Sequence, residues 1–124
     1  MKSVTIFWLA ILALIVIGVG SSFYVGTKGG KYDTFAQCLT DKGVIFYGAF
    51  WCPHCQATKR LFGASARLLP YVECSTPDAQ GQLQKCTDVG VQSYPTWVFP
   101  DGSRLTGQQP LATLAEKSQC VLPA

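Results

Sequence analysis

The sequence predicts an α/β domain, a central mixed sheet flanked by helices, behind a single N-terminal transmembrane helix. The chain has 124 residues, of which 48% are hydrophobic and only 14% charged, and this length supports one domain. The apolar residues crowd into positions 1–27, where Lys2 is the only charged side chain. In positions 28–124, short apolar runs alternate with helical patterns, which is typical of a sheet covered by helices.

The composition argues against two classes of protein. The formal net charge is +3 and the sequence contains no basic run, so nothing in it supports nucleic-acid binding. The content of aromatic and β-branched residues excludes an intrinsically disordered chain. We therefore expect a folded domain with no nucleic-acid partner.

Residues 1–27 are expected to form a membrane anchor. The seventeen residues 4–20 carry no charge, and a helix needs about 20 apolar residues to cross a hydrocarbon core. A cleaved signal peptide is the alternative, with Gly18 and Gly20 in a small-x-small cleavage site. The apolar run exceeds the usual length of the apolar region within a signal peptide, which favours the uncleaved anchor. No face of the segment is polar, which argues against a helix buried in a soluble core.

The rest of the sequence predicts a linker over Ser21–Gly30. The linker is followed by a helix, a strand, a helix, a strand, a helix, two strands and a final helix. The expected bounds, in that order, are Tyr32–Thr40, Val44–Phe50, Pro53–Leu68, Tyr71–Cys74, Thr76–Thr87, Thr96–Phe99, Arg104–Thr106 and Leu111–Cys120.

Local signals justify these elements. Phe35 and Leu39 lie four apart, on one face of the first helix. The run V-I-F-Y-G-A-F is continuously apolar, as expected for a strand buried on both faces. Pro53 suits the first turn of the next helix, where its missing N–H costs nothing, and Pro70 stops that helix. Asp101-Gly102 is a hairpin signal between the last two strands.

The motif Cys52-Pro53-His54-Cys55 lies where a buried strand ends and a helix begins. Free backbone N–H groups and the helix dipole stabilise a thiolate at the first cysteine. The second sulfur, one helical turn on, can reach the first and close a disulfide. A protonated His54 adds positive charge nearby. Half of a zinc site is the alternative, but His54 is the only histidine and no second C-x-x-C is present, so we expect no metal.

About forty residues later, Ser93-Tyr94-Pro95-Thr96-Trp97 leads into a strand. We expect a cis bond before Pro95, since cis X–Pro bonds are rare and mark special positions. In a redox site such a proline exposes backbone that can pair with an extended substrate. An ordinary proline at the start of a strand is the alternative.

Together these motifs resemble the thioredoxin superfamily. G-A-F-W-C-P-H-C, L-P-Y-V-E-C and S-Y-P-T-W are similar, in order, to the thioredoxin-like domain joined to bacterial and plant vitamin K epoxide reductase homologues. The resemblance covers about 32–120 and implies a thioredoxin-like fold. It implies that Cys52 is the nucleophile, Cys55 the resolving cysteine and Pro95 the cis-proline. Phe46 departs from the pattern, because typical thioredoxins carry a buried aspartate there.

The resemblance also bears on the other four cysteines, whose even number suggests structural disulfides and an oxidising compartment. Four cysteines allow three pairings. The resembling domains have a pair at the spacing of Cys74 and Cys86, which favours that pairing. Cys38 and Cys120 then remain to pair with each other. Buried free thiols are the alternative for both pairs.

The function expected from the sequence is that of a membrane-anchored thiol–disulfide oxidoreductase that oxidises protein thiols through Cys52 and Cys55 and needs no cofactor. The resemblance implies a separate, quinone-linked membrane reductase like vitamin K epoxide reductase as the recharging partner. Trp51, Tyr94 and Thr96 are candidate substrate contacts. Lys59 and Arg60 are expected on a solvated helix face.

Two other functions stay open: a reductase or isomerase fed by a membrane electron donor, and a module that binds copper or another soft metal through the C-x-x-C. Disulfides would be reduced in a cytosol. We therefore expect the globular part in an extracytoplasmic space, such as the periplasm or a thylakoid or other exoplasmic lumen, with Lys2 left inside.

Overall fold

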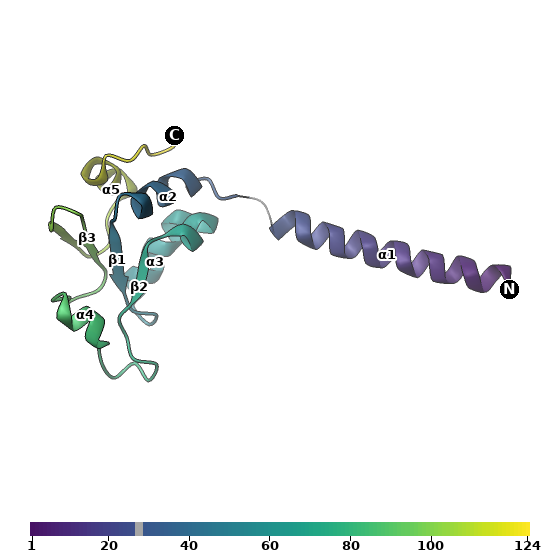
Figure 1. Cartoon of the computed structure of the whole chain (residues 1–124), viewed down its shortest axis with the longest axis horizontal. Coiled ribbons are helices and arrows are strands. Elements are labelled where there is room, and N and C mark those ends of the chain that lie inside the picture. Colours follow the sequence, from purple (N-terminus) through teal and green to yellow (C-terminus); the bar gives the residue numbers. More distant parts are fainter. Residues whose placement is uncertain (27–28) are drawn as a thin grey trace.

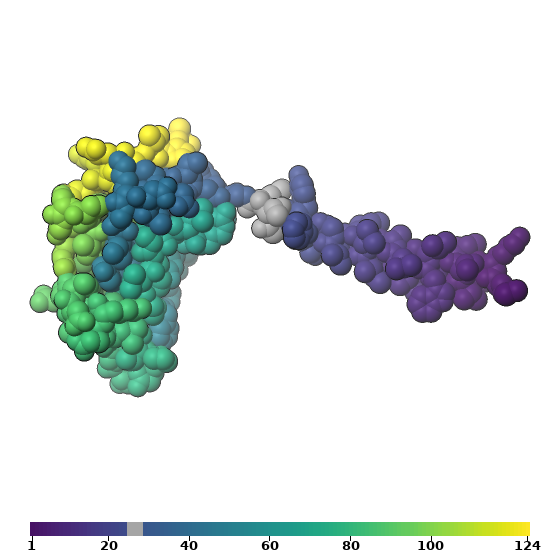
Figure 2. Space-filling model, in the orientation of Figure 1, coloured from purple at the N-terminus to yellow at the C-terminus, as the bar shows by residue number. Residues whose placement is uncertain are grey.

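The computed structural model describes the backbone of residues 1–26 and 29–124. Helix α1 spans Lys2–Gly26 and extends away from the globular part (Figures 1 and 2). Its segment Lys2–Tyr24 is long and apolar enough to cross a membrane, and no part of its most apolar stretch is buried against the domain. The helix is therefore a candidate membrane span.

The linker expected from Ser21 onward is wrong at its beginning, because α1 continues to Gly26. No proline or charged residue interrupts the sequence between Ser21 and Gly26, so nothing in this segment stops the helix. The expected boundary between anchor and domain, at positions 27 and 28, lies outside the described residues.

The globular part has the predicted order of elements, with one short 3₁₀ helix added. These elements are α2 (Asp33–Asp41), β1 (Ile45–Gly48), α3 (Pro53–Phe62), the 3₁₀ helix η1 (Gly63–Leu68), β2 (Tyr71–Glu73), α4 (Gln84–Asp88), β3 (Thr96–Val98), β4 (Arg104–Thr106) and α5 (Leu111–Ser118).

The four strands form one mixed sheet in the order β2-β1-β3-β4 (Figure 1). Strand β1 runs parallel to β2 and antiparallel to β3, and β4 is antiparallel to β3. Side chains alternate between the two faces of a strand, so neighbours in β1 belong to different cores. Phe46 packs in the core that includes residues of α2, α3 and α5, whereas Tyr47 packs with Cys86 of α4. This α/β architecture confirms the predicted fold class.

The helix expected over 53–68 is an α-helix only in its first part and a 3₁₀ helix in its second. The α-helical part ends at Phe62, and Gly63 adopts a φ of 56°, a conformation that favours glycine. The chain then continues as η1 up to Leu68, before Pro70. The bidentate ion pair between Arg67 and Asp33, at 2.7 and 3.0 Å, joins η1 to the start of α2.

The helix expected over 76–87 is wrong in its first half, because only Gln84–Asp88 is helical. The Thr76 hydroxyl donates to the Asp78 carboxylate at 2.6 Å and accepts the Gly81 N–H at 3.0 Å. Side chains of this kind offer the backbone an alternative to the helix. Residues 76–81 therefore form a tight loop, and α4 is short.

Candidate active site

The connection from β1 to α3 brings the two free cysteines together. Cys52 is the N-cap of α3 and Pro53 occupies its first turn, as the sequence predicted for this proline. The backbone N–H of Cys55 donates to the Cys52 sulfur at 3.2 Å. Both thiols are free and buried, with exposed fractions of 4% for Cys52 and 1% for Cys55. The helix N-terminus thus directs a hydrogen-bond donor at the first sulfur.

The loop before β3 forms the other side of the site. The Tyr94–Pro95 peptide bond is cis, and the Cys52 thiol donates to the Tyr94 carbonyl at 3.6 Å. Pro95 is fully buried, and its carbonyl accepts the N–H of Gly107 beyond β4. Segments about forty residues apart in the sequence therefore meet at Cys52.

Cys55 lies deeper than Cys52, and its surroundings oppose ionisation. Burial raises the pKa of the Cys55 thiol well above its usual range, and the neighbouring Cys52 raises it further. The ammonium of Lys59 acts in the opposite direction and lowers this pKa. A protonated Cys55 at neutral pH follows, although a resolving cysteine has to react as a thiolate.

An exposed aromatic surface borders Cys52. Phe50 and Trp51 are 48% and 46% exposed, which is unusual for large apolar side chains in the domain. The Trp51 ring contacts that of Tyr94 edge to face, at 5.9 Å between centroids, and its indole N–H donates to the Ser75 hydroxyl at 2.9 Å. These contacts fix the indole against Tyr94, whose carbonyl accepts from the Cys52 thiol, with part of the Trp51 side chain open to solvent.

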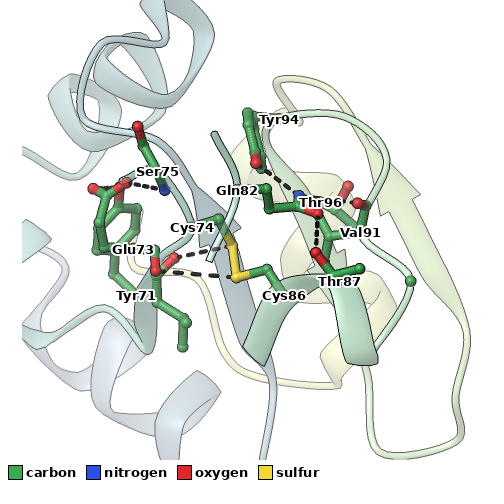
Figure 3. Close-up of a disulfide and its surroundings, with 12 residues drawn as sticks. Tyr71, Glu73, Cys74, Ser75, Gln82, Cys86, Thr87, Val91, Tyr94 and Thr96 are labelled. Atoms are coloured by element: carbon green, nitrogen blue, oxygen red, sulfur yellow. Dashed lines mark hydrogen bonds between the residues drawn. A yellow bond between two sulfur atoms is a disulfide. The ribbon is translucent and has the colours of Figure 1, made fainter. Parts of the chain in front are cut away.

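The other two candidate substrate contacts are more enclosed. Tyr94 is half-buried, and its hydroxyl accepts a hydrogen bond from the Gln82 amide at 2.7 Å (Figure 3). Thr96 is 3% exposed, and its hydroxyl donates to the Ser93 carbonyl at 2.7 Å. The Thr96 side chain is thus engaged within the protein.

His54 lies on the exposed side of α3. It borders an open groove together with Leu61 and the loop 107–110 that precedes α5. Among the described residues its imidazole makes no hydrogen bond to either free sulfur. The described residues also contain no group of three or more His, Cys, Asp or Glu side chains that could hold a metal.

The remaining four cysteines form two disulfides. Cys74 is joined to Cys86, with a Cα–Cα distance of 5.7 Å, and Figure 3 shows this bond between β2 and α4. Cys38 of α2 is joined to Cys120, just beyond α5, with a Cα–Cα distance of 6.0 Å. The two bonds hold opposite sides of the sheet without involving the free pair.

Sequence reasoning missed the group of side chains on β2 and α3 next to Cys55. Lys59 is not simply solvated as expected, because its Nζ lies 3.5 Å from the centre of the Tyr71 ring. Its position four residues after Cys55 puts it on the same helix face, and this spacing could have indicated the contact. Nothing in the sequence indicated that the Glu73 carboxylate would accept the backbone N–H groups of Phe50 and Ser75.

Comparison with known proteins agrees with this geometry. The thioredoxin family model matches residues 27–119. The chain is also 42% identical, over 86 residues, to the thiol-disulfide oxidoreductase LTO1 of Arabidopsis thaliana. That match covers 65% of this chain but about a fifth (22%) of the relative's length. The chain therefore belongs to the thioredoxin family.

Proposed function

We propose that this chain is a membrane-anchored thiol–disulfide oxidoreductase that donates its Cys52–Cys55 disulfide to protein thiols. The observation that carries the proposal is the Cys52 sulfur at the N-terminus of α3, with the Cys55 N–H directed at it at 3.2 Å. A helix N-terminus stabilises the thiolate, and stabilising the reduced form makes the disulfide a stronger oxidant. A protonated His54 would add to this effect.

The reaction proceeds in two exchanges. A substrate thiolate attacks the Cys52 sulfur, the Cys52–Cys55 bond breaks, and Cys55 leaves as a thiolate that takes up a proton. A second substrate thiolate then attacks the substrate sulfur of the mixed disulfide, which releases Cys52 as a thiolate. The substrate gains one disulfide and loses two electrons, and both cysteines end reduced. When the domain is recharged or acts as a reductase, Cys55 instead attacks the mixed disulfide at Cys52.

The aromatic surface and the cis-proline loop support a role in substrate binding. Trp51, the residue before Cys52, offers partly exposed apolar area, as a site for unfolded chains requires. The backbone of Tyr94, which precedes the cis-proline, would pair with an extended substrate segment. Because the Thr96 hydroxyl is engaged internally and its backbone pairs with both β1 and β4, Thr96 would support the loop at Tyr94 and Pro95 rather than touch the substrate.

The anchor and the disulfides support an extracytoplasmic position. Cys74–Cys86 and Cys38–Cys120 would not persist in a reducing cytosol, so the globular part belongs in the periplasm or an exoplasmic lumen. Helix α1 would remain attached as the membrane span. Extraction of membranes with alkaline carbonate tests the anchor: we expect the full-length chain in the pellet, and a shortened chain in the soluble fraction would contradict it.

The recharging partner we propose is a separate membrane reductase linked to quinone, similar to vitamin K epoxide reductase. The support is the resemblance of the three motifs to domains joined to such reductases. The match to LTO1, which spans only part of that protein, is compatible with such a partner. The partner would oxidise the Cys52–Cys55 pair after each round of substrate oxidation.

Trapping of mixed disulfides tests the roles of the two cysteines. Cys55→Ala removes the thiol whose attack releases a partner from Cys52, so mixed disulfides with substrates and with the membrane reductase should accumulate on non-reducing gels. Cys52→Ala, the matched control, should form none, because burial raises the pKa of the Cys55 thiol and keeps it protonated. Equal trapping by the two variants would contradict the assignment.

A further inference from the structure

In the proposed mechanism the Cys55 thiol gains a proton when the Cys52–Cys55 bond breaks and loses it when that bond is restored, and β1 offers it no carboxylate. Phe46 is fully buried, in the position where typical thioredoxins carry a buried aspartate. Its ring stacks on Trp97, at 4.4 Å between centroids, and meets the Tyr71 ring edge to face at 5.2 Å. Aromatic side chains therefore fill the space, and the group that assists Cys55 has to come from another element.

The Tyr71 ring and the Cys55 sulfur lie on either side of Gly48. Gly48, on β1, separates them: a Cβ atom added there would be 2.8 Å from Cε2 of Tyr71 and 3.0 Å from the Cys55 sulfur. The two side chains thus border the same gap, which the missing side chain of Gly48 leaves. The edge of the Tyr71 ring is part of the environment of this sulfur.

Lys59 covers the face of the same ring. Its Nζ lies 3.5 Å from the centre of the Tyr71 ring, within the range of a cation–π interaction. Lys59 follows Cys55 by one helical turn, so both side chains leave α3 on the same face. A positive charge close to a thiol favours the thiolate, and the Lys59 ammonium lowers the pKa of Cys55 against the effect of burial.

Glu73 holds the ring in place. The Tyr71 hydroxyl donates to Oε2 of Glu73 at 2.7 Å, and Oε1 accepts the backbone N–H of Ser75 at 2.8 Å, a group drawn in Figure 3. Oε1 also accepts the N–H of Phe50 at 3.2 Å. Burial and the Glu73 carboxylate raise the pKa of Tyr71, so the phenol stays protonated and acts as a neutral platform rather than as a base.

We propose that Lys59 is a positioning residue for the resolving cysteine: held over the Tyr71 ring, its ammonium supplies the charge that favours the Cys55 thiolate in the absence of a carboxylate at Phe46. The inference rests on the proposed role of Cys55. The ionisable groups that shift the pKa of Cys55 are Cys52, the N-cap of α3, and Lys59 within α3. Tyr71 of β2, whose own pKa is raised by Cys55, stays neutral, while Phe46 and Gly48 from β1 cannot ionise. Lys59 is the cation of this set.

The attack by Cys55 can be observed with the chromogenic disulfide dithiobis-nitrobenzoate and the reduced full-length chain in detergent. The Cys52 thiolate first breaks the probe's disulfide, forms a mixed disulfide and releases one thionitrobenzoate. The Cys55 thiolate then attacks the Cys52 sulfur, forms the Cys52–Cys55 bond and releases the second. Two thiols are oxidised, their protons go to solvent, and the probe is reduced to two thiolates.

In Lys59→Met we expect the second release to slow by about threefold to tenfold at neutral pH, and its pH profile to move upward by up to about one unit. Arg60→Met, which removes a charge from the next position of the same helix, is the matched control and should keep the original profile. Lys59→Arg should restore most of the rate because it restores the cation.

A second release in Lys59→Met that follows the profile of Arg60→Met would overturn the proposal. So would a slowing that is the same at every pH and that Lys59→Arg does not rescue, because a merely structural defect has that signature. The rate of the first release reports whether the site is folded, and Lys59→Gln replaces Lys59→Met if that rate is lost. Absence of a second release in the unaltered chain would instead contradict the proposed role of Cys55.

Discussion

Cys55 combines nearly complete burial with a proposed role, the attack on a mixed disulfide, that requires a charged thiolate. Burial raises the pKa of its thiol above the value of about 9.0 of an ordinary cysteine. In alkaline solution the unfolded chain therefore loses a proton that the folded chain keeps. The free energy of unfolding then falls as pH rises, by at most about 1.4 kcal/mol per pH unit for this one group.

This difference predicts a pH-dependent stability that belongs to Cys55 alone. In a Cys52→Ala background, unfolding by urea should become easier from about pH 9 upward, relative to Cys52→Ala/Cys55→Ala. The double variant is the control, because every other titrating group is common to both chains. A stability difference that stays constant from about pH 8 to about pH 10 would contradict the assigned direction of the shift.

Individual residues could be predicted from the sequence where their motif has a distinctive chemistry. Cys52 and Cys55 were predictable because C-x-x-C at the start of a helix has a mechanism of its own. Lys59 was expected in solvent, since a lysine beside an arginine on a helix is usually exposed. Its contact depends on the Tyr71 ring, which reaches α3 only after β2 pairs with β1.

Among the elements, the strands and most helices follow from apolar runs and prolines, whereas the segment between β2 and α4 does not. Thr76 and Asp78 read as the start of a long helix, but their side chains hydrogen-bond to each other and with Gly81 to form a loop. Whether Thr76 caps a helix or closes a loop depends on where the following residues pack. Ser75 and Gln82, on either side of the loop, pair through a single antiparallel β-bridge, and this pairing favours the loop. Local sequence alone could not decide it.

The two disulfides connect elements over very different lengths of chain. Cys74 and Cys86 are 12 positions apart, and Cys38 and Cys120 are 82 apart. A cross-link that closes a longer loop restricts the unfolded chain more, with chain-entropy values of about 3 and about 4.5 kcal/mol. Replacing Cys38 and Cys120 together by Ala should therefore destabilise the domain more than replacing Cys74 and Cys86 together.

Urea unfolding of the two double variants, with Cys52 and Cys55 kept oxidised, measures the difference. We expect the Cys38→Ala/Cys120→Ala variant to lose about 1–2 kcal/mol more than Cys74→Ala/Cys86→Ala. Each variant serves as the control for the other, because each loses one disulfide and gains two alanines. A larger loss from the shorter loop would show that packing around Cys74 and Cys86, rather than chain entropy, dominates.

At the scale of the whole molecule, an apolar helix and a thioredoxin-family domain are joined in one chain (Figure 1). The anchor would hold the domain near the membrane and would raise the local concentration of any membrane reductase that recharges it. The fold class was predictable because its motifs occur in order. The depth of Cys55 and its contact with β2 were not, because they arise from packing between elements distant in the sequence.

The reduction potential of the Cys52–Cys55 pair tests the central claim most directly. Equilibration of the full-length chain with glutathione buffers, followed by alkylation of free thiols, gives this potential. Stabilisation of the Cys52 thiolate by the N-terminus of α3 predicts a reduction potential well above that of thioredoxin, which is about −270 mV. The potential should approach that of strong disulfide donors, which is about −120 mV. A value at or below about −270 mV would contradict the account and identify the domain as a reductase.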